Sequence, residues 1–177
     1  AGIVATDGIE FREHRGVGMV SDVFSGGALE KLPGRIAIGH NRYSTTGGSQ
    51  LENAQPIVVN YREGTLAIAH NGNLVNALAL REEMEAKGSI FRTTSDTEVI
   101  LHLIARSTAT EIERMIPEAL ARCQGAYSLV LLAADKLIVS LKSQGRSNSG
   151  REASTVVAGL IPYDFDKAVE VFVAAEQ

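Results

Sequence analysis

The chain has 177 residues, of which 45% are hydrophobic and 21% are charged, and its formal net charge is −4. This length suits one domain, or a domain with part of another, and the apolar fraction can build a core, which argues against a disordered chain. The acidic balance lacks the basic excess that phosphate contacts need, so we expect no nucleic-acid partner. No apolar run approaches the roughly 18 residues of a membrane-spanning helix, so we expect no membrane partner.

The cysteine content and the first residues bear on the compartment and the extent of the protein. Cys123 is the only cysteine, which excludes an internal disulfide and a metal site built from several cysteines. A reducing, cytoplasmic location is the simplest expectation. A strand-like segment over residues 2–6 begins at once, with no initiator Met and no signal-peptide pattern. We therefore expect a further segment before Ala1 in the natural protein.

The first third of the chain is glycine-rich and strand-like. A short helix is predicted to open at Ser21, and a strand is predicted over residues 35–40. Two more strands, over residues 56–60 and 65–70, flank a polar link over residues 61–64. This pair is typical of an antiparallel hairpin whose link is longer than the tightest turns.

The middle of the chain is predicted to be helical. Apolar residues recur at helical spacing over residues 74–84, and Gly88 is placed to end that helix. Residues 95–98 have the Ser-x-x-Glu spacing of a capping box and open a second helix. Residues 110–113 repeat this signature and open a third helix, in which Pro117 predicts a kink or a restart.

The last third returns to strands, separated by a polar run over residues 142–151. The order of strands, helices and strands indicates an α+β fold with helices packed on largely antiparallel sheets. We divide the chain into a domain over residues 1–140 and a divergent tail over residues 141–177, whose candidate strands would complete the same domain. The predicted strands of this third cover residues 126–133, 136–140, 155–159 and 169–174.

Three polar islands carry the candidate chemistry, over residues 39–48, 70–73 and 93–98. They lie at strand ends and at a helix start, where a rigid scaffold presents side chains and free backbone N–H groups. Arg42 fits an α-carboxylate bidentately, and Asp96 fits an ammonium group. Asn71 offers an amide donor, and Gly72 lets a substrate oxygen approach its backbone N–H. Together they predict a site that holds an amino acid by its backbone and polarises a side-chain carbonyl.

Each island also has a simpler interpretation. Asn71-Gly72 alone is most often a turn, and Asp96 alone is most often a partner of the helix dipole. Structural hydrogen bonds are commoner than catalysis for histidines such as His40 and His70. The occurrence of all three islands in this order favours the functional interpretation.

The islands resemble the glutaminase domain of the amidophosphoribosyltransferase family, which opens purine biosynthesis. The resemblance runs from Ala1 to about Val139, in several long segments that are together far more specific than a short pattern. These segments are GHNRYSTTG from residue 39, NAQP from residue 53, AHNGNLVN from residue 69 and TTSDTEV from residue 93.

The resemblance implies an N-terminal-nucleophile hydrolase fold, a four-layer α/β/β/α sandwich with two antiparallel sheets, here incomplete. In this family an N-terminal cysteine thiolate attacks the side-chain amide of glutamine, with its own α-amine as the base. The match implies that Arg42 binds the α-carboxylate of glutamine, with Thr45 beside it. It implies that Asp96 binds the α-ammonium group, and that Asn71 and the Gly72 N–H form the oxyanion hole.

The resemblance also implies partners and cofactors outside this sequence. The released ammonia would pass to a phosphoribosyltransferase domain of the intact chain and displace pyrophosphate from phosphoribosyl pyrophosphate. Magnesium is expected in that transferase domain, and an iron–sulfur cluster occurs in some intact relatives. We expect no cofactor in this chain itself, and a homo-oligomer for the intact protein.

Two departures from the family bear on activity. The nucleophile's own strand does not precede residues 2–4, and Ala1 has no nucleophilic side chain. Cys123 ends a helical pattern with no α-amine beside it, so a small buried hydrophobe is its better interpretation. We therefore expect the chain as written to bind glutamine without hydrolysing it. The second departure is the segment after Ser140, which does not match the family.

Three functions follow from the sequence. The first is the glutaminase domain of an amidophosphoribosyltransferase. The second is the related domain of a hexosamine-forming amidotransferase, against which Tyr43 and residues 71–74 speak. The third is a non-catalytic glutamine-binding module on the same fold, which the missing nucleophile supports. Binding of glutamine without turnover would separate the third from the first.

Overall fold

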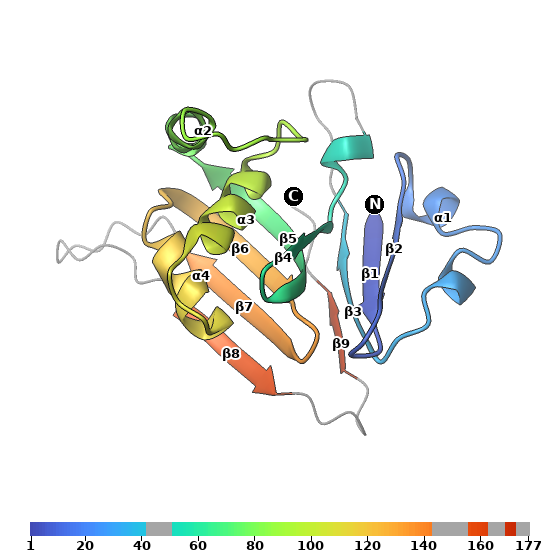
Figure 1. Ribbon diagram of the computed structural model, residues 1–177. Coiled ribbons are helices and arrows are strands. Elements are labelled where there is room, and N and C mark those ends of the chain that lie inside the picture. Colours follow the sequence, from blue (N-terminus) through green and yellow to red (C-terminus); the bar gives the residue numbers. More distant parts are fainter. Residues whose placement is uncertain (42–50, 143–155, 163–168, 173–177) are drawn as a thin grey trace, which may run out of the picture.

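The computed structural model describes residues 1–41, 51–142, 156–162 and 169–172. They fold into two β-sheets that face each other, and helices cover the outer face of the larger sheet (Figure 1). The α+β class predicted from the sequence is confirmed. Among the described helices, none combines the length and the apolar character that crossing a bilayer requires.

The larger sheet has five antiparallel strands in the order β4-β5-β6-β7-β8. The link between β4 and β5 is shorter than predicted, because Tyr61 already pairs with Gly64. Gly64 takes a φ of 116°, which a glycine adopts without steric cost, so the chain reverses within two residues. The strands are β4 (Ile57–Tyr61), β5 (Gly64–Leu74), β6 (Gly125–Leu132), β7 (Lys136–Lys142) and β8 (Val156–Pro162).

The smaller sheet has the order β2-β1-β3-β9 and is antiparallel except at its edge, where β9 runs parallel to β3. The sequence pattern predicts no strand at β2, because its residues, Phe-Arg-Glu-His-Arg, are nearly all ionisable. Pairing with β1 over five residues makes it a strand. The strands are β1 (Gly2–Thr6), β2 (Phe11–Arg15), β3 (Ile36–His40) and β9 (Val169–Phe172).

Three helices cover the outer face of the larger sheet: α2 (Ala77–Glu85), α3 (Asp96–Arg106) and α4 (Ile112–Leu120). The helix α4 runs through Pro117 as one element, so the predicted restart is wrong. The second capping box is also wrong, because Glu111 occupies the N-cap position without a side-chain cap. Glu113 instead forms an ion pair with Lys136 on β7, at 2.7 Å.

Short helical turns accompany the smaller sheet: α1 (Val20–Val23), η1 (Leu29–Lys31) and η2 (Leu51–Asn53). The helix near Ser21 is confirmed in α1. His14 on β2 donates from Nε2 to the carbonyl oxygen of Val23 at 2.8 Å, which ties α1 to this sheet. In Figure 1, α1 lies beside β2, on the side of the smaller sheet that is away from the larger one.

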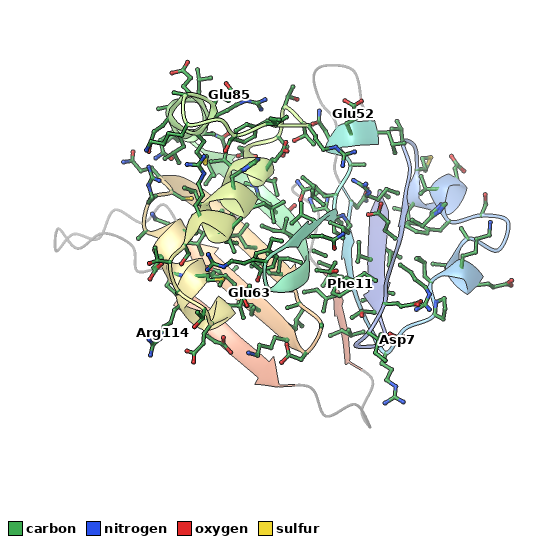
Figure 2. All side chains as sticks on the ribbon, in the orientation of Figure 1. Asp7, Phe11, Glu52, Glu63, Glu85 and Arg114 are labelled. Carbon is green, nitrogen blue, oxygen red and sulfur yellow. The ribbon has the colours of Figure 1, made fainter. Side chains whose placement is uncertain are left out.

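Two apolar cores hold the layers together. The core between the sheets contains Val4 and Ile38 from the smaller sheet and Ala69 and Leu132 from the larger one. Figure 2 shows Phe11 on the side of its sheet that faces the larger sheet, and it packs against this core. The second, larger core lies between the five-stranded sheet and the three helices. The five-stranded sheet therefore has both faces buried, and polar side chains on it need hydrogen-bond partners.

Candidate functional site

The strand β5 positions most of the described site. Successive side chains of a strand point to opposite faces, and here Ile68 packs into the helix-side core while Ala69 packs into the core between the sheets. His70 therefore faces the helices, and Asn71 faces the smaller sheet. The simpler interpretation of Asn71-Gly72 as a turn is wrong, because β5 continues to Leu74.

Gly72 has a structural reason to be glycine. Its φ is 124°, and a Cβ at this position would lie 2.3 Å from the carbonyl oxygen of Ala126 and 2.8 Å from the Cα of Tyr127. Both contacts are to the backbone of β6, which cannot withdraw without breaking the β5–β6 pairing. Close approach of the neighbouring strand thus requires a glycine here, independently of any substrate.

His40 joins the two sheets at the site. This residue is the last of β3 and is 6% exposed. Its Nε2 lies 2.7 Å from Oδ1 of Asn71 and 3.1 Å from the carbonyl oxygen of His70. Burial lowers the pKa of His40 from its ordinary value, although the bonds to Asn71 and His70 oppose the shift. The ring is therefore neutral at pH 7.

A buried hydrogen-bond network connects β5 to the start of α3. The backbone N–H of His70 donates to Oε1 of Gln55 at 2.6 Å, and Nε2 of Gln55 donates to the Thr97 hydroxyl at 3.2 Å. The His70 ring completes the connection, since its Nδ1 lies 3.0 Å from the same hydroxyl. No role is predicted for Gln55 or Thr97 from the sequence alone. Their places in the NAQP and TTSDTEV segments are the signal that could have found them.

Asp96 is the first residue of α3, and its side chain is 23% exposed. Its Oδ2 accepts a hydrogen bond from the Leu74 N–H at 2.9 Å, and its Oδ1 lies 3.5 Å from Nδ1 of His70. Burial acts to raise the pKa of Asp96, but the His70 interaction and the bonds from the Leu74 and Thr97 N–H groups outweigh it and lower the pKa. The site therefore contains an ionised, partly exposed carboxylate, which suits an ammonium group.

The loop before α3 is held by a buried carboxylate. Ser95 caps the helix as predicted, because its Oγ accepts from the Thr97 N–H at 3.2 Å. Glu98 does not complete the capping box. Its carboxylate accepts from the Arg92 N–H at 2.9 Å and from the Thr93 N–H at 2.7 Å. These three hydrogen bonds fix the loop that presents Asp96.

The second motif segment also contacts this loop. The side chain of Asn53 donates from Nδ2 to the Thr94 hydroxyl at 3.0 Å and accepts from the Thr94 N–H at 3.2 Å. Asn53 belongs to the NAQP segment and Thr94 to the TTSDTEV segment. Motifs that are about forty residues apart in the sequence therefore form one surface.

The structure brings together part of the predicted site. Asn71 and Gly72 lie on β5, and Asp96 is bonded to the end of the same strand. Arg42 and Thr45 lie outside the described residues.

Cys123 is not placed for catalysis. Its side chain is buried, its Sγ donates to the carbonyl oxygen of Ala119, and burial raises its pKa to about 11. A thiol in this state supplies almost no thiolate at neutral pH. Within the described residues, no group of three or more His, Cys, Asp or Glu side chains is arranged to hold a metal ion.

Comparisons with known sequences give a family. A family model described as a glutamine amidotransferase domain matches residues 40–145. The chain is 54% identical over 138 residues to the chloroplastic amidophosphoribosyltransferase of Vigna aconitifolia, covering 78% of this chain and 28% of the relative. It is 47% identical over 146 residues to the amidophosphoribosyltransferase of Bacillus subtilis (strain 168), covering 82% of this chain and 31% of the relative. The chain thus spans under a third of the length of these relatives.

Solved structures agree with the sequences. The chain superposes with a TM-score of 0.78 and 46% identity on a structure titled as the allosteric regulatory enzyme of purine biosynthesis, covering 81% of this chain and 31% of that one. The glutamine phosphoribosylpyrophosphate amidotransferase of B. subtilis, complexed with ADP and GMP, gives a TM-score of 0.75 at 45% identity, covering 80% of this chain and 30% of that one. The predicted N-terminal-nucleophile hydrolase fold is confirmed. Since the matched segment is more than half of the chain, the protein belongs to the glutamine amidotransferase domain family.

Proposed function

We propose that this domain releases ammonia from glutamine for an amidophosphoribosyltransferase reaction, which forms phosphoribosylamine in the first step of de novo purine biosynthesis. The observation that carries the proposal is the Asp96 carboxylate, held in its ionised form at the end of the strand that bears Asn71 and Gly72. In glutamine, Asp96 would bind the cationic α-amine, and Asn71 with the Gly72 N–H would bind the side-chain amide carbonyl. The names of the relatives support the assignment of the ammonia to an amidophosphoribosyltransferase reaction.

In the proposed reaction, Asp96 binds the α-ammonium group and Arg42, with Thr45 beside it, binds the α-carboxylate. A thiolate attacks the side-chain amide carbon, and Asn71 and the Gly72 N–H stabilise the oxyanion that forms. Collapse of this intermediate breaks the C–N bond, and the protonated nitrogen leaves as ammonia. Water then hydrolyses the thioester to give glutamate. Cys123 is too deeply buried for this role, so the proposal assigns the thiolate to a residue outside this sequence.

The remaining parts of the proposal concern the whole protein. The glutaminase domain would pass its ammonia to a phosphoribosyltransferase domain of the same protein, and magnesium would act in that domain. The complete protein would form a homo-oligomer in the cytoplasm. Iron–sulfur clusters need several thiolate ligands, and this sequence has one cysteine. Where an intact relative carries such a cluster, the corresponding ligands would lie outside this domain.

The test compares the complete natural protein that contains this sequence with the 177-residue chain. We expect the complete protein to convert glutamine to glutamate and to form phosphoribosylamine when phosphoribosyl pyrophosphate is present. The isolated chain should release no ammonia above the blank, because it lacks a reactive thiolate. Ammonia release by the isolated chain would overturn the assignment of the nucleophile.

A non-catalytic glutamine-binding module is the competing function, favoured by the inert thiol of Cys123. Calorimetry with glutamine distinguishes the two. Binding by the complete protein without formation of glutamate would establish the module.

In the catalytic case, Asp96→Ala should raise the KM for glutamine by about ten- to a hundredfold, because a charge-assisted contact is lost. Synthesis with added ammonia should stay unchanged.

A further inference from the structure

We propose that His40 is a positioning residue that sets the orientation of the Asn71 side-chain amide, so that its NH2 group and not its oxygen faces the substrate. This inference rests on the proposed glutaminase function, because it assigns a cause to the orientation of the oxyanion donor. His40 contacts Asn71, and its proposed role does not require a contact with glutamine.

The hydrogen-bond inventory around Nε2 of His40 determines the tautomer. This nitrogen lies 3.1 Å from the carbonyl oxygen of His70, and a carbonyl oxygen can only accept a hydrogen bond. The nitrogen must therefore carry the hydrogen. The ring is neutral, since burial lowers the pKa of His40, so the proton resides on Nε2.

The tautomer of His40 in turn determines the amide orientation of Asn71. The side-chain atom of Asn71 that lies 2.7 Å from Nε2 must be an acceptor, and in a carboxamide only the oxygen accepts. If the amide were rotated by 180°, two donors would face each other in a buried place, at a cost comparable to a lost hydrogen bond. The NH2 group is consequently directed away from His40. An oxyanion hole needs this orientation, because only the NH2 group can donate to the developing negative charge.

The rigidity of the surroundings makes His40 effective in this role. It is 6% exposed and ends β3, a strand of the smaller sheet, whereas Asn71 belongs to β5 of the larger sheet. The contact thus spans the two sheets, and the second acceptor, the His70 carbonyl, belongs to the backbone of β5 itself. The imidazole is fixed by one strand and by the backbone of the other, so it can select one of the two amide orientations.

The experiment is a double-mutant cycle in the complete natural protein, with glutamine-dependent and ammonia-dependent synthesis both measured. We expect His40→Ala to lower kcat with glutamine by about ten- to a hundredfold. This is less than the roughly hundred- to thousandfold loss seen when an oxyanion donor is removed, because the donor is here displaced and not removed. The KM for glutamine should change less than threefold, and synthesis with ammonia should be unchanged. In the Asn71→Ala background, His40→Ala should cost no further activity, because its effect passes through Asn71.

Two further variants separate positioning from general damage. His40→Gln keeps an N–H donor within reach of the same acceptors and should recover most of the lost kcat. His14→Gln is the matched control, since Nε2 of His14 on β2 also bonds a backbone carbonyl, that of Val23 in α1, and this bond does not involve β5. The kcat of this variant should equal that of the unchanged protein.

The possible failures are distinguishable. If the unchanged protein does not consume glutamine, the proposed function itself is wrong. If it is active and His40→Ala keeps full kcat, or if the effects of His40→Ala and Asn71→Ala simply multiply, the positioning role is wrong. A rise in KM alone would also overturn it, because that result would assign His40 to substrate binding.

Discussion

Asp96 shows how the environment keeps a single, partly exposed carboxylate ionised. Its carboxylate accepts a backbone hydrogen bond from Leu74 and lies beside the buried ring of His70, while part of it stays exposed. These interactions keep the carboxylate ionised, and the exposed part can meet a cation. The same arrangement couples the site to the stability of the fold, because the bonds exist only in the native state.

The lowered pKa of Asp96 predicts acid sensitivity. Its folded pKa lies below the unfolded value of about 3.9. The carboxylate therefore contributes stability that is present above about pH 4 and is lost as the pH falls through the lowered folded pKa. We expect the free energy of unfolding to fall less between pH 6 and pH 3 in Asp96→Asn than in the unchanged chain. Urea denaturation at several pH values measures this, and parallel pH profiles would contradict it.

Gly72 and Gly64 form a matched pair for a second prediction at this scale. Both have positive φ, at 124° and 116°, but a Cβ on Gly72 would meet the backbone of β6 whereas a Cβ on Gly64 would meet nothing within 4 Å. We expect Gly64→Ala to cost about 1–3 kcal/mol of backbone strain. Gly72→Ala should cost more, because the strands must also separate. Equal shifts of the denaturation midpoint would show that the clash is relieved without cost.

At the scale of elements, the loop before α3 depends on one buried acidic side chain. Glu98 lies in the first turn of the helix, where a carboxylate also interacts favourably with the helix dipole. Its carboxylate accepts hydrogen bonds from the Arg92 and Thr93 N–H groups and so ties the preceding loop to the first turn of the helix. The position of Asp96 therefore depends on the side chain of Glu98, two residues further along the helix.

Glu98→Gln tests this dependence. In the unchanged protein, the Arg92 and Thr93 N–H groups bond the two carboxylate oxygens of Glu98, whereas the neutral amide of the variant has one acceptor oxygen. We therefore expect a loss of about 1.5–3 kcal/mol in the free energy of unfolding. Glu85→Gln is the control, because Glu85 lies at the surface (Figure 2). Its ion pair with Arg81 is exposed, so this substitution should change stability by no more than about 1 kcal/mol. Equal effects in the two variants, measured by denaturant unfolding, would show that the loop does not need the charge.

For the whole molecule, the five-stranded sheet is the layer that both cores share. Adjacent residues of β6 point into different cores: Leu131 belongs to the helix-side core and Leu132 to the core between the sheets, and both are fully buried. The sheet cannot lose its packing on one face without weakening the other. We therefore expect the layers to unfold together.

Leu131→Ala and Leu132→Ala test this cooperativity. Each should lower the free energy of unfolding by about 2–5 kcal/mol and shift a single transition, seen alike by circular dichroism and by tyrosine fluorescence. Leu141→Ala, at a position that is 46% exposed on β7, should have a much smaller effect. Two separate transitions in either core variant would mean that the layers are independent.

The sequence by itself determined the local structure and the family. Short apolar runs predicted β6, β7 and the first part of β5, and the Ser95 cap marked the start of α3, because these signals depend on neighbours within a few residues. The long motif segments identified the amidotransferase family, and burial of Cys123 followed from its place in a helical pattern. These conclusions did not need any contact between distant parts of the chain.

Only the tertiary structure decided which distant groups meet. The charged strand β2 exists because β1 offers a partner, and Glu98 bonds the preceding loop because burial leaves its carboxylate no water. His40 meets Asn71 across 31 residues of sequence, and Gln55 meets Thr97 across 42. No local pattern encodes such pairs. They form because packing two sheets and a helix layer removes water from polar side chains, which must then bond to whichever partner the fold brings near.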